Sequence, residues 1–473
     1  MPPTIASVTP SAALVAKYGR PGPRYTSYPA VPYWPAEYPV ASWREALADL
    51  GREALADPSH GVSLYVHVPF CEKRCLFCAC NVVVTRKHER GPSYVDTVRR
   101  EIDDVADAIG DARVRVSQMH WGGGTPTWLT SDELRSLQAA VASRFELLPD
   151  REQSIEVDPR VTTLAQLDAL RELGVNRLSM GVQDTDPAVQ RAIARHQSVA
   201  QTAGIVTHAR TLGIDGITVD IIYGLPEQTL DSFRRTIDTV IELGVDRVAV
   251  YNFAYLPERV KHQRAIDPAA LPDADTRVEL MCTASERFAA AGYDMIGMDH
   301  FARHDDELAR ARRDGTMQRN FMGYTTRAGQ DLLAFGASAI SRVGRDFAQN
   351  AKTATEYAEH VDAGRSPVVA GMRLSDDDVL RESVIAALMC YGEVDLGRIA
   401  REHGVDLLAS GRARLAIEAL QGDGLVRWRG ETLVVTDLGR YFVRNVAMTF
   451  DAYLDGPAPT VARAPTVRFS ATV

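Results

Sequence analysis

From residue 61 to about residue 253 the sequence alternates short apolar strands with amphipathic helices, and this alternation restricts the fold more than any other feature. The segments with the apolar character of buried strands are SLYVHV, RVSQMHW, SIEVD, NRLSMGVQ, GITVDIIYGLP and DRVAVYNF. Because a helix between two strands usually makes them parallel neighbours, the pattern predicts an α/β fold with a parallel sheet. Six units are too few for an eight-fold barrel, so we expect an open, partial (β/α)6 TIM-like barrel with ligands at the carboxyl ends of its strands.

The 473 residues are too many for one ordinary core, and they divide into four parts. Residues 1–60 are rich in Pro and Tyr and predict an N-terminal arm, and residues 61–350 hold the catalytic barrel. Residues 351–455 predict a mainly helical, winged-helix-like C-terminal domain with a hairpin at LVRWRG and ETLVVTD. Such a module either binds DNA or serves as a packing or lid domain, and its mixed charge favours packing. Residues 456–473 predict a loose tail.

Composition narrows the class of function. The net charge is -9, which gives no indication of nucleic-acid binding. The first residues lack the basic start and apolar core of a signal peptide, and no apolar run is long enough to span a membrane. We therefore expect a cytoplasmic protein, in which thiols stay reduced.

Four of the six cysteines, Cys71, Cys75, Cys78 and Cys80, lie within ten residues that follow the first predicted strand. A reduced compartment argues against disulfides and favours metal or redox chemistry. Zinc is the alternative, but structural zinc sites usually pair two separated Cys/His couples. The C-x3-C-x2-C spacing is typical of a four-iron cluster in radical S-adenosylmethionine (radical SAM) enzymes, where one iron lacks a protein ligand and binds the cofactor.

Several further segments resemble one family, the oxygen-independent coproporphyrinogen III oxidases. They are YVHVPFCEKRCLFCAC, YGRPGPRYTSYP, HWGGGTPT, SIEVDPR, NRLSMGVQD, DIIYGLPEQT, GMDHFARHDDEL and GYTT. The resemblance runs from about residue 17 to about residue 455 and implies a radical SAM barrel. It also implies oxidative decarboxylation of two propionates of coproporphyrinogen III to vinyl groups, which gives protoporphyrinogen IX in anaerobic haem biosynthesis.

The alternatives are a haem chaperone of the same superfamily, the radical methylases and haem-degrading relatives, and a winged-helix regulator with a sensing cluster. The arm and the fourth cysteine argue against the chaperone. The arm also argues against the methylases, and together with the acidic net charge against the regulator.

The resemblance implies one [4Fe-4S] cluster on Cys71, Cys75 and Cys78, and two S-adenosylmethionine molecules. The positions that match contacts to the first molecule are Tyr65, Gly123, Glu156, Ala254 and Ile340. Those that match contacts to the second are Phe77, Gly124, Thr125, Gln183, Arg195 and Asp220. Cys80 is a catalytic candidate whose role the sequence leaves open. Asp220 also stands out by itself, because it interrupts the apolar strand ITVDII.

A substrate with four propionates needs cations around it, and the candidates are Arg20, Arg24, His300 and Arg303. The arm tyrosines Tyr25 and Tyr28 either pack on the tetrapyrrole or fasten the arm to the barrel. The expected partners are this small-molecule substrate and a reducing electron donor such as flavodoxin or ferredoxin. We expect the protein to be a monomer.

Overall fold

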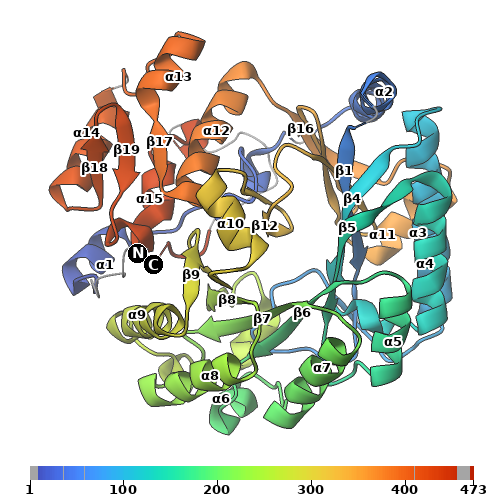
Figure 1. Ribbon diagram of the computed structural model, residues 1–473, viewed down its shortest axis with the longest axis horizontal. Helices are drawn as coiled ribbons and strands as arrows, with labels where there is room; N and C mark the ends of the chain where they lie inside the picture. Colours follow the sequence, from blue (N-terminus) through green and yellow to red (C-terminus); the bar gives the residue numbers. More distant parts are fainter. Residues whose placement is uncertain (1–8, 36, 58, 410, 455–468, 473) are drawn as a thin grey trace.

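The computed structural model describes residues 9–35, 37–57, 59–409, 411–454 and 469–472. Its main feature is a twisted 12-stranded sheet with the strand order β16-β15-β14-β13-β1-β4-β5-β6-β7-β8-β10-β9 (Figure 1). The six strands predicted from the sequence form its parallel centre: β1 (Gly61–Val68), β4 (Arg115–Gly123), β5 (Glu146–Val157), β6 (Arg177–Gln183), β7 (Gly216–Tyr223) and β8 (Arg247–Asn252). The predicted partial barrel is therefore confirmed.

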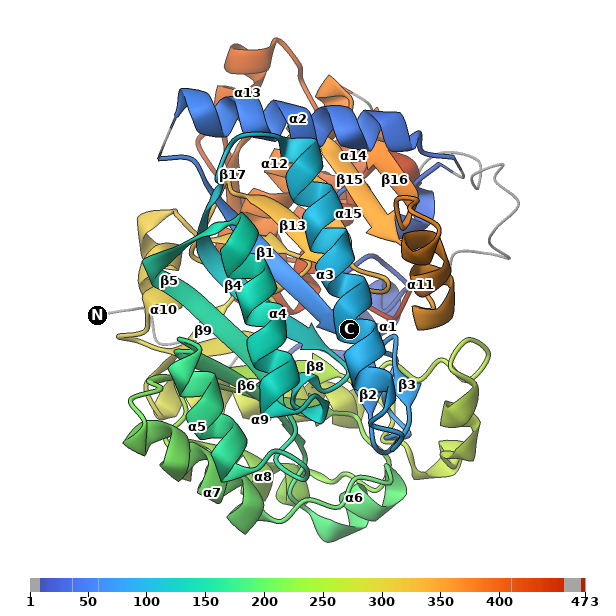
Figure 2. The same ribbon diagram turned by 90° about the vertical axis from the view of Figure 1, so that its right-hand side faces the viewer.

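Helices cover the outer face of these strands, as Figures 1 and 2 show. They are α3 (Arg90–Ile109), α4 (Ser131–Arg144), α5 (Leu164–Glu172), α6 (Pro187–Ala192), α7 (Val199–Thr211), α8 (Leu230–Glu242) and α9 (Ala274–Ala290). Several begin at a capping box, such as Thr130 with Glu133 at the start of α4, where two side chains satisfy free backbone amides.

Side chains alternate along each parallel strand between the helix layer and the inner face of the sheet. In β1, Val62, Leu64 and Val66 are fully buried in the main hydrophobic core, which also contains the apolar residues of α3 and α4. Tyr65 between them points to the opposite face, where its ring stacks on His120 of β4. The strand period thus separates an apolar outer face from an inner face that carries polar groups.

Both edges of the sheet carry strands that the sequence pattern did not predict. On one side β13 (Asp331–Phe335) pairs parallel to β1, and three antiparallel strands follow it: β14 (Ile340–Val343), β15 (Asp346–Asn350) and β16 (Val368–Arg373). On the other side β10 (His300–Arg303) pairs antiparallel to β8 and β9 (Tyr293–Ile296). By strand pairing, residues 351–373, with helix α11 (Ala354–Asp362), belong with the sheet, whereas the sequence prediction gave them to the C-terminal domain.

Within its described residues, the N-terminal arm forms the helices α1 (Ala12–Tyr18) and α2 (Val40–Ala56), with the short 3-10 turn η1 (Val31–Tyr33) between them. The helix α2 packs against α3 beside the barrel (Figure 2). Tyr25 donates a hydrogen bond to Asp451 over 3.0 Å, and the Tyr28 hydroxyl accepts one from the Ala452 amide over 3.1 Å. These two tyrosines fasten the arm to the C-terminal domain.

The C-terminal domain combines several short helices with the small three-stranded sheet β17-β19-β18, as in a winged-helix module. Its elements are α12 (Asp376–Tyr391), β17 (Glu393–Asp395), α13 (Leu396–His403), α14 (Gly411–Gly422), β18 (Val426–Arg429), β19 (Thr432–Val435), η5 (Gly439–Phe442), α15 (Val443–Met448) and η6 (Ala452–Leu454). The predicted hairpin is β18–β19. The apolar residues of the C-terminal domain share one hydrophobic core with the arm and with Val278 and Cys282 of α9.

The predicted tail lies mostly outside the described residues, but its end at 469–472 packs against the arm. Ala471 forms a β-bridge with Pro21, and the Thr472 hydroxyl donates to the Tyr18 carbonyl over 2.6 Å. Among the described residues, no helix is both long and apolar enough to cross a membrane.

Candidate active site

The cysteine loop leaves the carboxyl end of β1, as the sequence predicts for a ligand site. Cys71 ends the two-residue strand β2 (Phe70–Cys71), which pairs with β3 (Val83–Val84) and closes the loop at its base. Cys75 is buried, Cys71 and Cys78 are half-buried, and Cys80 is exposed. A backbone bond from Leu76 to the Ile193 carbonyl holds the middle of the loop against the end of α6.

A cavity of about 350 Å³ lies between this loop and the carboxyl ends of β4 to β8. It brings together most of the residues that the sequence selected: Cys71, Cys75, Phe77, Cys78, Cys80, Gly123, Gly124, Thr125, Glu156, Gln183, Arg195 and Asp220. Parallel strands explain this convergence, because their carboxyl ends meet at one edge of the sheet.

The surroundings of Cys75 fit a thiolate ligand. Two guanidinium groups reach its sulfur: Arg160 at 3.5 Å and Arg195 at 3.6 Å. Asp158 pairs with both arginines and holds them in place. Neither Asp158 nor Arg160 was a candidate from the sequence, although their position directly after the strand SIEV is a signal that could have found them.

A single zinc ion would hold the cysteine sulfurs close together, because zinc–sulfur bonds of about 2.3 Å bring them within about 3.8 Å of each other. Among the described residues, the group of three or more potential ligands whose atoms lie within 4.8 Å of one another is Glu53, His60 and Asp331, which lies elsewhere. The choice between zinc and a multi-iron cluster at the cysteines therefore rests on their C-x3-C-x2-C spacing in the sequence.

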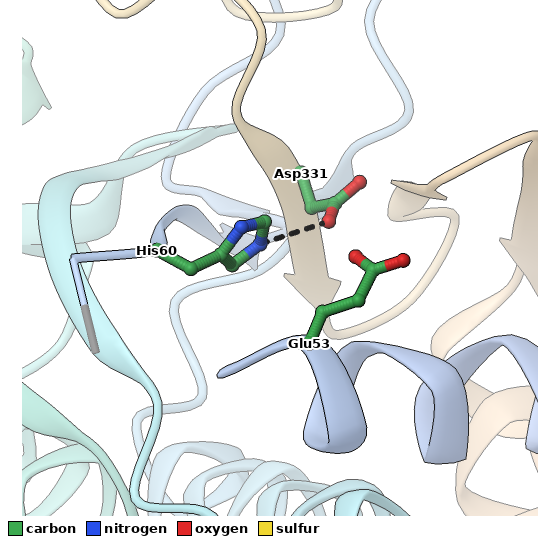
Figure 3. Close-up of side chains that lie close together, drawn as sticks. All are labelled: Glu53, His60 and Asp331. Atoms are coloured by element: carbon green, nitrogen blue, oxygen red, sulfur yellow. Dashed lines mark ion pairs between the residues drawn. The ribbon is translucent and has the colours of Figure 1, made fainter. Parts of the chain in front are cut away.

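Figure 3 shows the group of Glu53, His60 and Asp331, which comes from α2, the start of β1 and β13. His60 Nε2 lies 3.4 Å from an oxygen of Asp331, and Glu53 is exposed. The contact between His60 and Asp331 joins the residue before β1 to the start of β13.

The cavity also fits a polar cofactor, because buried polar atoms on its wall lack partners. Gln183 Oε1 and Arg195 Nε are buried and have no hydrogen-bond partner in the described part of the chain. Gln183 has a φ of 68°, a conformation in which side chains are uncommon and which often marks functional sites. A ligand with donor and acceptor groups would satisfy both atoms.

Two carboxylates on the inner face have opposite electrostatic properties. Burial tends to raise the pKa of Glu156, but the hydrogen bond and charge of His120 and the Gly123 amide, at 2.9 Å, bring it below its ordinary value. Burial raises the pKa of Asp220 to about 7, and the nearby Glu156 charge adds to this shift. The site therefore holds one carboxylate that is ionised at neutral pH and one that exchanges its proton there.

The glycine turn after β4 is required by close backbone packing. Gly123 has a φ of 118°, and a Cβ on Gly124 would lie 2.7 Å from the Phe70 carbonyl oxygen. The Gly124 and Thr125 amides donate to the Val68 and Phe70 carbonyls over 2.8 Å, which joins this turn to the start of the cysteine loop.

We expect Gly124→Ala to displace the cysteine loop, because its methyl group meets fixed backbone rather than a movable side chain. The expected result is at least a tenfold loss of S-adenosylmethionine affinity in equilibrium dialysis, with the far-ultraviolet circular dichroism unchanged. Gly204→Ala is the matched control, since a Cβ there meets nothing within 4 Å. Equal affinities in the two variants would contradict this account of the turn.

Three predicted cofactor contacts do not line this cavity. The Tyr65 hydroxyl lies 3.1 Å from His67 Nδ1 on the inner face of β1. The Ala254 carbonyl accepts a hydrogen bond from Gln263, and Ile340 packs with the cluster around Trp34 and Phe347. Their assigned contacts remain predictions.

The four substrate candidates fall into different places. Arg24 of the arm pairs with Asp299 and lies over the Tyr251 ring, at 5.5 Å from its centroid. His300 Nδ1 lies 2.6 Å from the same Asp299 carboxylate. The charges of His300 and Arg24 lower the pKa of Asp299, against the effect of its burial. Tyr251, which the sequence did not single out, also lines the cofactor cavity, so Arg24 and His300 adjoin it.

Arg20 and Arg303 are exposed and separate from this group. Arg303 ends β10, where its amide bonds to the Asp246 carbonyl at the start of β8. Because β10 is antiparallel to β8, this places Arg303 at the amino edge of the parallel strands, opposite the cysteines. Its geometry gives no support to the predicted substrate contact.

Known proteins are similar to this chain over nearly its whole length. A family model described as the radical SAM superfamily matches residues 65–240, and one described as the HemN C-terminal domain matches residues 374–442. The chain is 43% identical to the oxygen-independent coproporphyrinogen III oxidase of Pseudomonas aeruginosa, over 94% of this chain and 96% of that protein. It is 42% identical to the protein of the same name from Escherichia coli K12, over 93% and 95%.

Among solved structures, it is similar to the coproporphyrinogen III oxidase HemN from Escherichia coli, which is described as a radical SAM enzyme. The two share 39% sequence identity with a TM-score of 0.87, over 95% of this chain and 100% of that one.

Proposed function

Because this chain belongs to the oxygen-independent coproporphyrinogen III oxidases of the radical SAM superfamily, we propose that it decarboxylates two propionate side chains of coproporphyrinogen III. Each propionate loses a hydrogen atom, one electron and CO₂ and becomes a vinyl group, so the product is protoporphyrinogen IX. The observation that carries this proposal is the convergence on one cavity of the proposed cluster cysteines, two arginines and three carboxylates, namely Cys71, Cys75, Cys78, Arg160, Arg195, Glu156, Asp158 and Asp220.

Membership of the superfamily brings a [4Fe-4S] cluster and S-adenosylmethionine, and the residues fit both. When bound, the cluster and the cofactor supply a 5′-deoxyadenosyl radical that removes hydrogen from the propionate β-carbon. In this chain, Cys71, Cys75 and Cys78 would hold the cluster. Arg160 and Arg195 each place a guanidinium group within 3.6 Å of the Cys75 sulfur.

The remaining lining residues would bind and orient S-adenosylmethionine. Glu156 is ionised at neutral pH and can accept hydrogen bonds from hydroxyl groups or an ammonium group. Phe77 stands between two cluster cysteines and excludes water from that side. Two cofactor molecules are proposed, because the predicted contacts divide between Gly123 and Glu156 for one and Gln183 and Arg195 for the other.

An electron donor must reach the cluster, and we propose an acidic flavodoxin or ferredoxin. Lys73 and Arg74 in the cysteine loop and Arg86 and Lys87 just after it are exposed and would attract such a protein. Iron–sulfur chemistry and reduced thiols support a cytoplasmic location, and we propose that the protein acts as a monomer.

The test is an anaerobic assay of the reconstituted protein with reductant, S-adenosylmethionine and coproporphyrinogen III. We expect protoporphyrinogen IX together with two 5′-deoxyadenosines for each product molecule, since two hydrogen atoms are removed. Deoxyadenosine without a vinyl product would reject this substrate and favour the methylases or haem-degrading relatives. Tight stoichiometric haem binding with neither product would favour the chaperone.

A further inference from the structure

A second cavity lies beside the cofactor cavity, where the arm, the barrel and the C-terminal domain meet. Its volume is about 60 Å³, and its walls come from β7, β8, α9 and α15. Figure 1 shows α9 and α15 on the side of the molecule where α1 of the arm packs. We call it the arginine cavity because four guanidinium groups line it, those of Arg24, Arg277, Arg440 and Arg444.

Positive charge in the arginine cavity exceeds negative charge. Asp299 is the acidic residue on its walls within the described part of the chain, and it already pairs with Arg24 and His300. Arg444 donates to neutral acceptors, the carbonyls of Gly22, Pro23 and Ala471. Burial and the neighbouring Arg24 lower the pKa of Arg444 to about 9, which is the effect expected of positive charge that lacks a counter-ion.

Arg277 is the group available to a ligand. It projects from the first turns of α9 and is half-buried, and its side chain has no hydrogen bond or ion pair in the described residues. Arg440 lies across the cavity and is 3.6 Å from Asp437, a separation that leaves most of its donors free. The charge of Arg277 acts on the exposed Asp273 one turn earlier, but the two form no ion pair, so a half-buried arginine is left that a second anion would stabilise.

The size of the arginine cavity selects the class of anion. A volume of about 60 Å³ holds a few water molecules or one carboxylate at the end of a short chain, and it cannot hold a tetrapyrrole. Planar guanidinium groups bind carboxylates through paired hydrogen bonds. A propionate that enters from a larger ring outside therefore fits this cavity by both size and charge.

Neighbouring residues of β7 and β8 line the arginine cavity and the cofactor cavity, and Arg24 of the former lies over the Tyr251 ring of the latter. In β7, Asp220 lines the cofactor cavity and Tyr223 lines the arginine cavity. In β8, Tyr251 lines the former and Asn252 the latter. A ring with several propionates can therefore place one group at the cofactor and another among the arginines.

We propose that the arginine cavity binds a propionate carboxylate of the tetrapyrrole that is not being decarboxylated, with Arg277 as its principal partner. This inference rests on the proposed function, because it takes a polycarboxylate tetrapyrrole as the substrate. It makes Arg277 a positioning residue that sets which propionate faces the cofactor.

The test measures binding apart from turnover, with coproporphyrin III as a fluorescent, non-reacting probe of the full-length reconstituted protein. We expect Arg277→Gln to raise its Kd about tenfold, the effect of losing one charge-assisted hydrogen bond. Arg277→Lys should recover part of the affinity. Arg287→Gln is the matched control on the same helix, because Arg287 pairs with Asp238 away from the cavity. The tetramethyl ester of coproporphyrin should bind equally to all variants.

A kinetic measurement separates this inference from the proposed function. We expect Arg277→Gln to raise KM and to release more of the product with a single vinyl group, with 5′-deoxyadenosine still formed. A wild-type protein that makes no vinyl product rejects the proposed function, whatever the titration shows. If the wild type makes the vinyl product, and Arg277→Gln and Arg287→Gln have equal Kd values and equal product ratios, the arginine cavity is rejected as the propionate site. Binding of inorganic phosphate to Arg277 at millimolar concentration, without competition with coproporphyrin, would also reject the propionate assignment. The arginine cavity would then be a site for a free anion.

Discussion

We expect Cys75→Ser to prevent cluster assembly and to reduce the formation of 5′-deoxyadenosine more than a thousandfold. Cys75 is the position of the site at which we expect the largest effect. Cys75 is the buried cysteine of the loop, and both Arg160 and Arg195 reach its sulfur. Serine keeps the size but not the soft, easily ionised sulfur that iron prefers. Iron and sulfide per chain, the visible absorption of the cluster and deoxyadenosine formation measure the effect together.

Cys80→Ser is the matched control, because it makes the same chemical change five residues away. Cys80 is exposed and stands outside the C-x3-C-x2-C set, so this variant should retain its iron and still cleave S-adenosylmethionine. Any loss confined to the vinyl product would then define the role of Cys80 as catalytic. Loss of iron from Cys80→Ser, or retention of iron by Cys75→Ser, would contradict the assignment of the three ligands.

The second large effect concerns a buried carboxyl group that joins α3 to the edge of the sheet. Glu101 is 3% exposed and accepts hydrogen bonds from the Gly336 amide at 2.8 Å, from Asn350 at 2.5 Å and from Tyr357 at 2.5 Å. These donors favour the ionised form, but burial outweighs them and raises the pKa of Glu101 from 4.5 to about 7.

The sign of the pH dependence follows from this shift. The unfolded chain releases the proton near pH 4.5, whereas the folded protein keeps it until about pH 7. Between these values the folded state binds more protons, so stability falls as pH rises. The contribution is fully present below pH 4.5, and about 3 kcal/mol of it is lost by pH 7.

Urea unfolding of the wild type and of Glu101→Gln at pH 5, 6 and 7 measures this loss. The quantity compared is the slope of the free energy of unfolding against pH in the two proteins. Gln cannot ionise, so the free energy of unfolding of the variant should vary less with pH. The variant should also be less stable at every pH, because the amide group of Gln faces three hydrogen-bond donors. Asp107→Asn on the same helix is the control, because Asp107 is exposed in an ion pair with Arg144 and should leave the slope unchanged. Parallel pH profiles for the wild type and Glu101→Gln would disprove the raised pKa.

Much of the fold and part of the site could be predicted because their signals are local. The six parallel strands are apolar runs between capped amphipathic helices, and each signal lies within about a dozen residues. The position of Glu156 and Asp220 follows from the same local pattern, since polar residues on buried strands must face a site or a partner. The short edge strands, such as β10 and β14, contain charged residues and turns and gave no such signal.

The sequence by itself determined the parallel barrel and the position of the cysteine loop at the end of β1, and it predicted three cluster thiols there, because these signals lie in spacing along the chain. Only the tertiary structure decided what surrounds them. Arg160 meets Cys75 across 85 positions, Arg24 meets Asp299 across 275, and Arg444 meets the Pro23 carbonyl across 421. Contacts at such separations depend on how whole elements pack, and no local pattern carries that information.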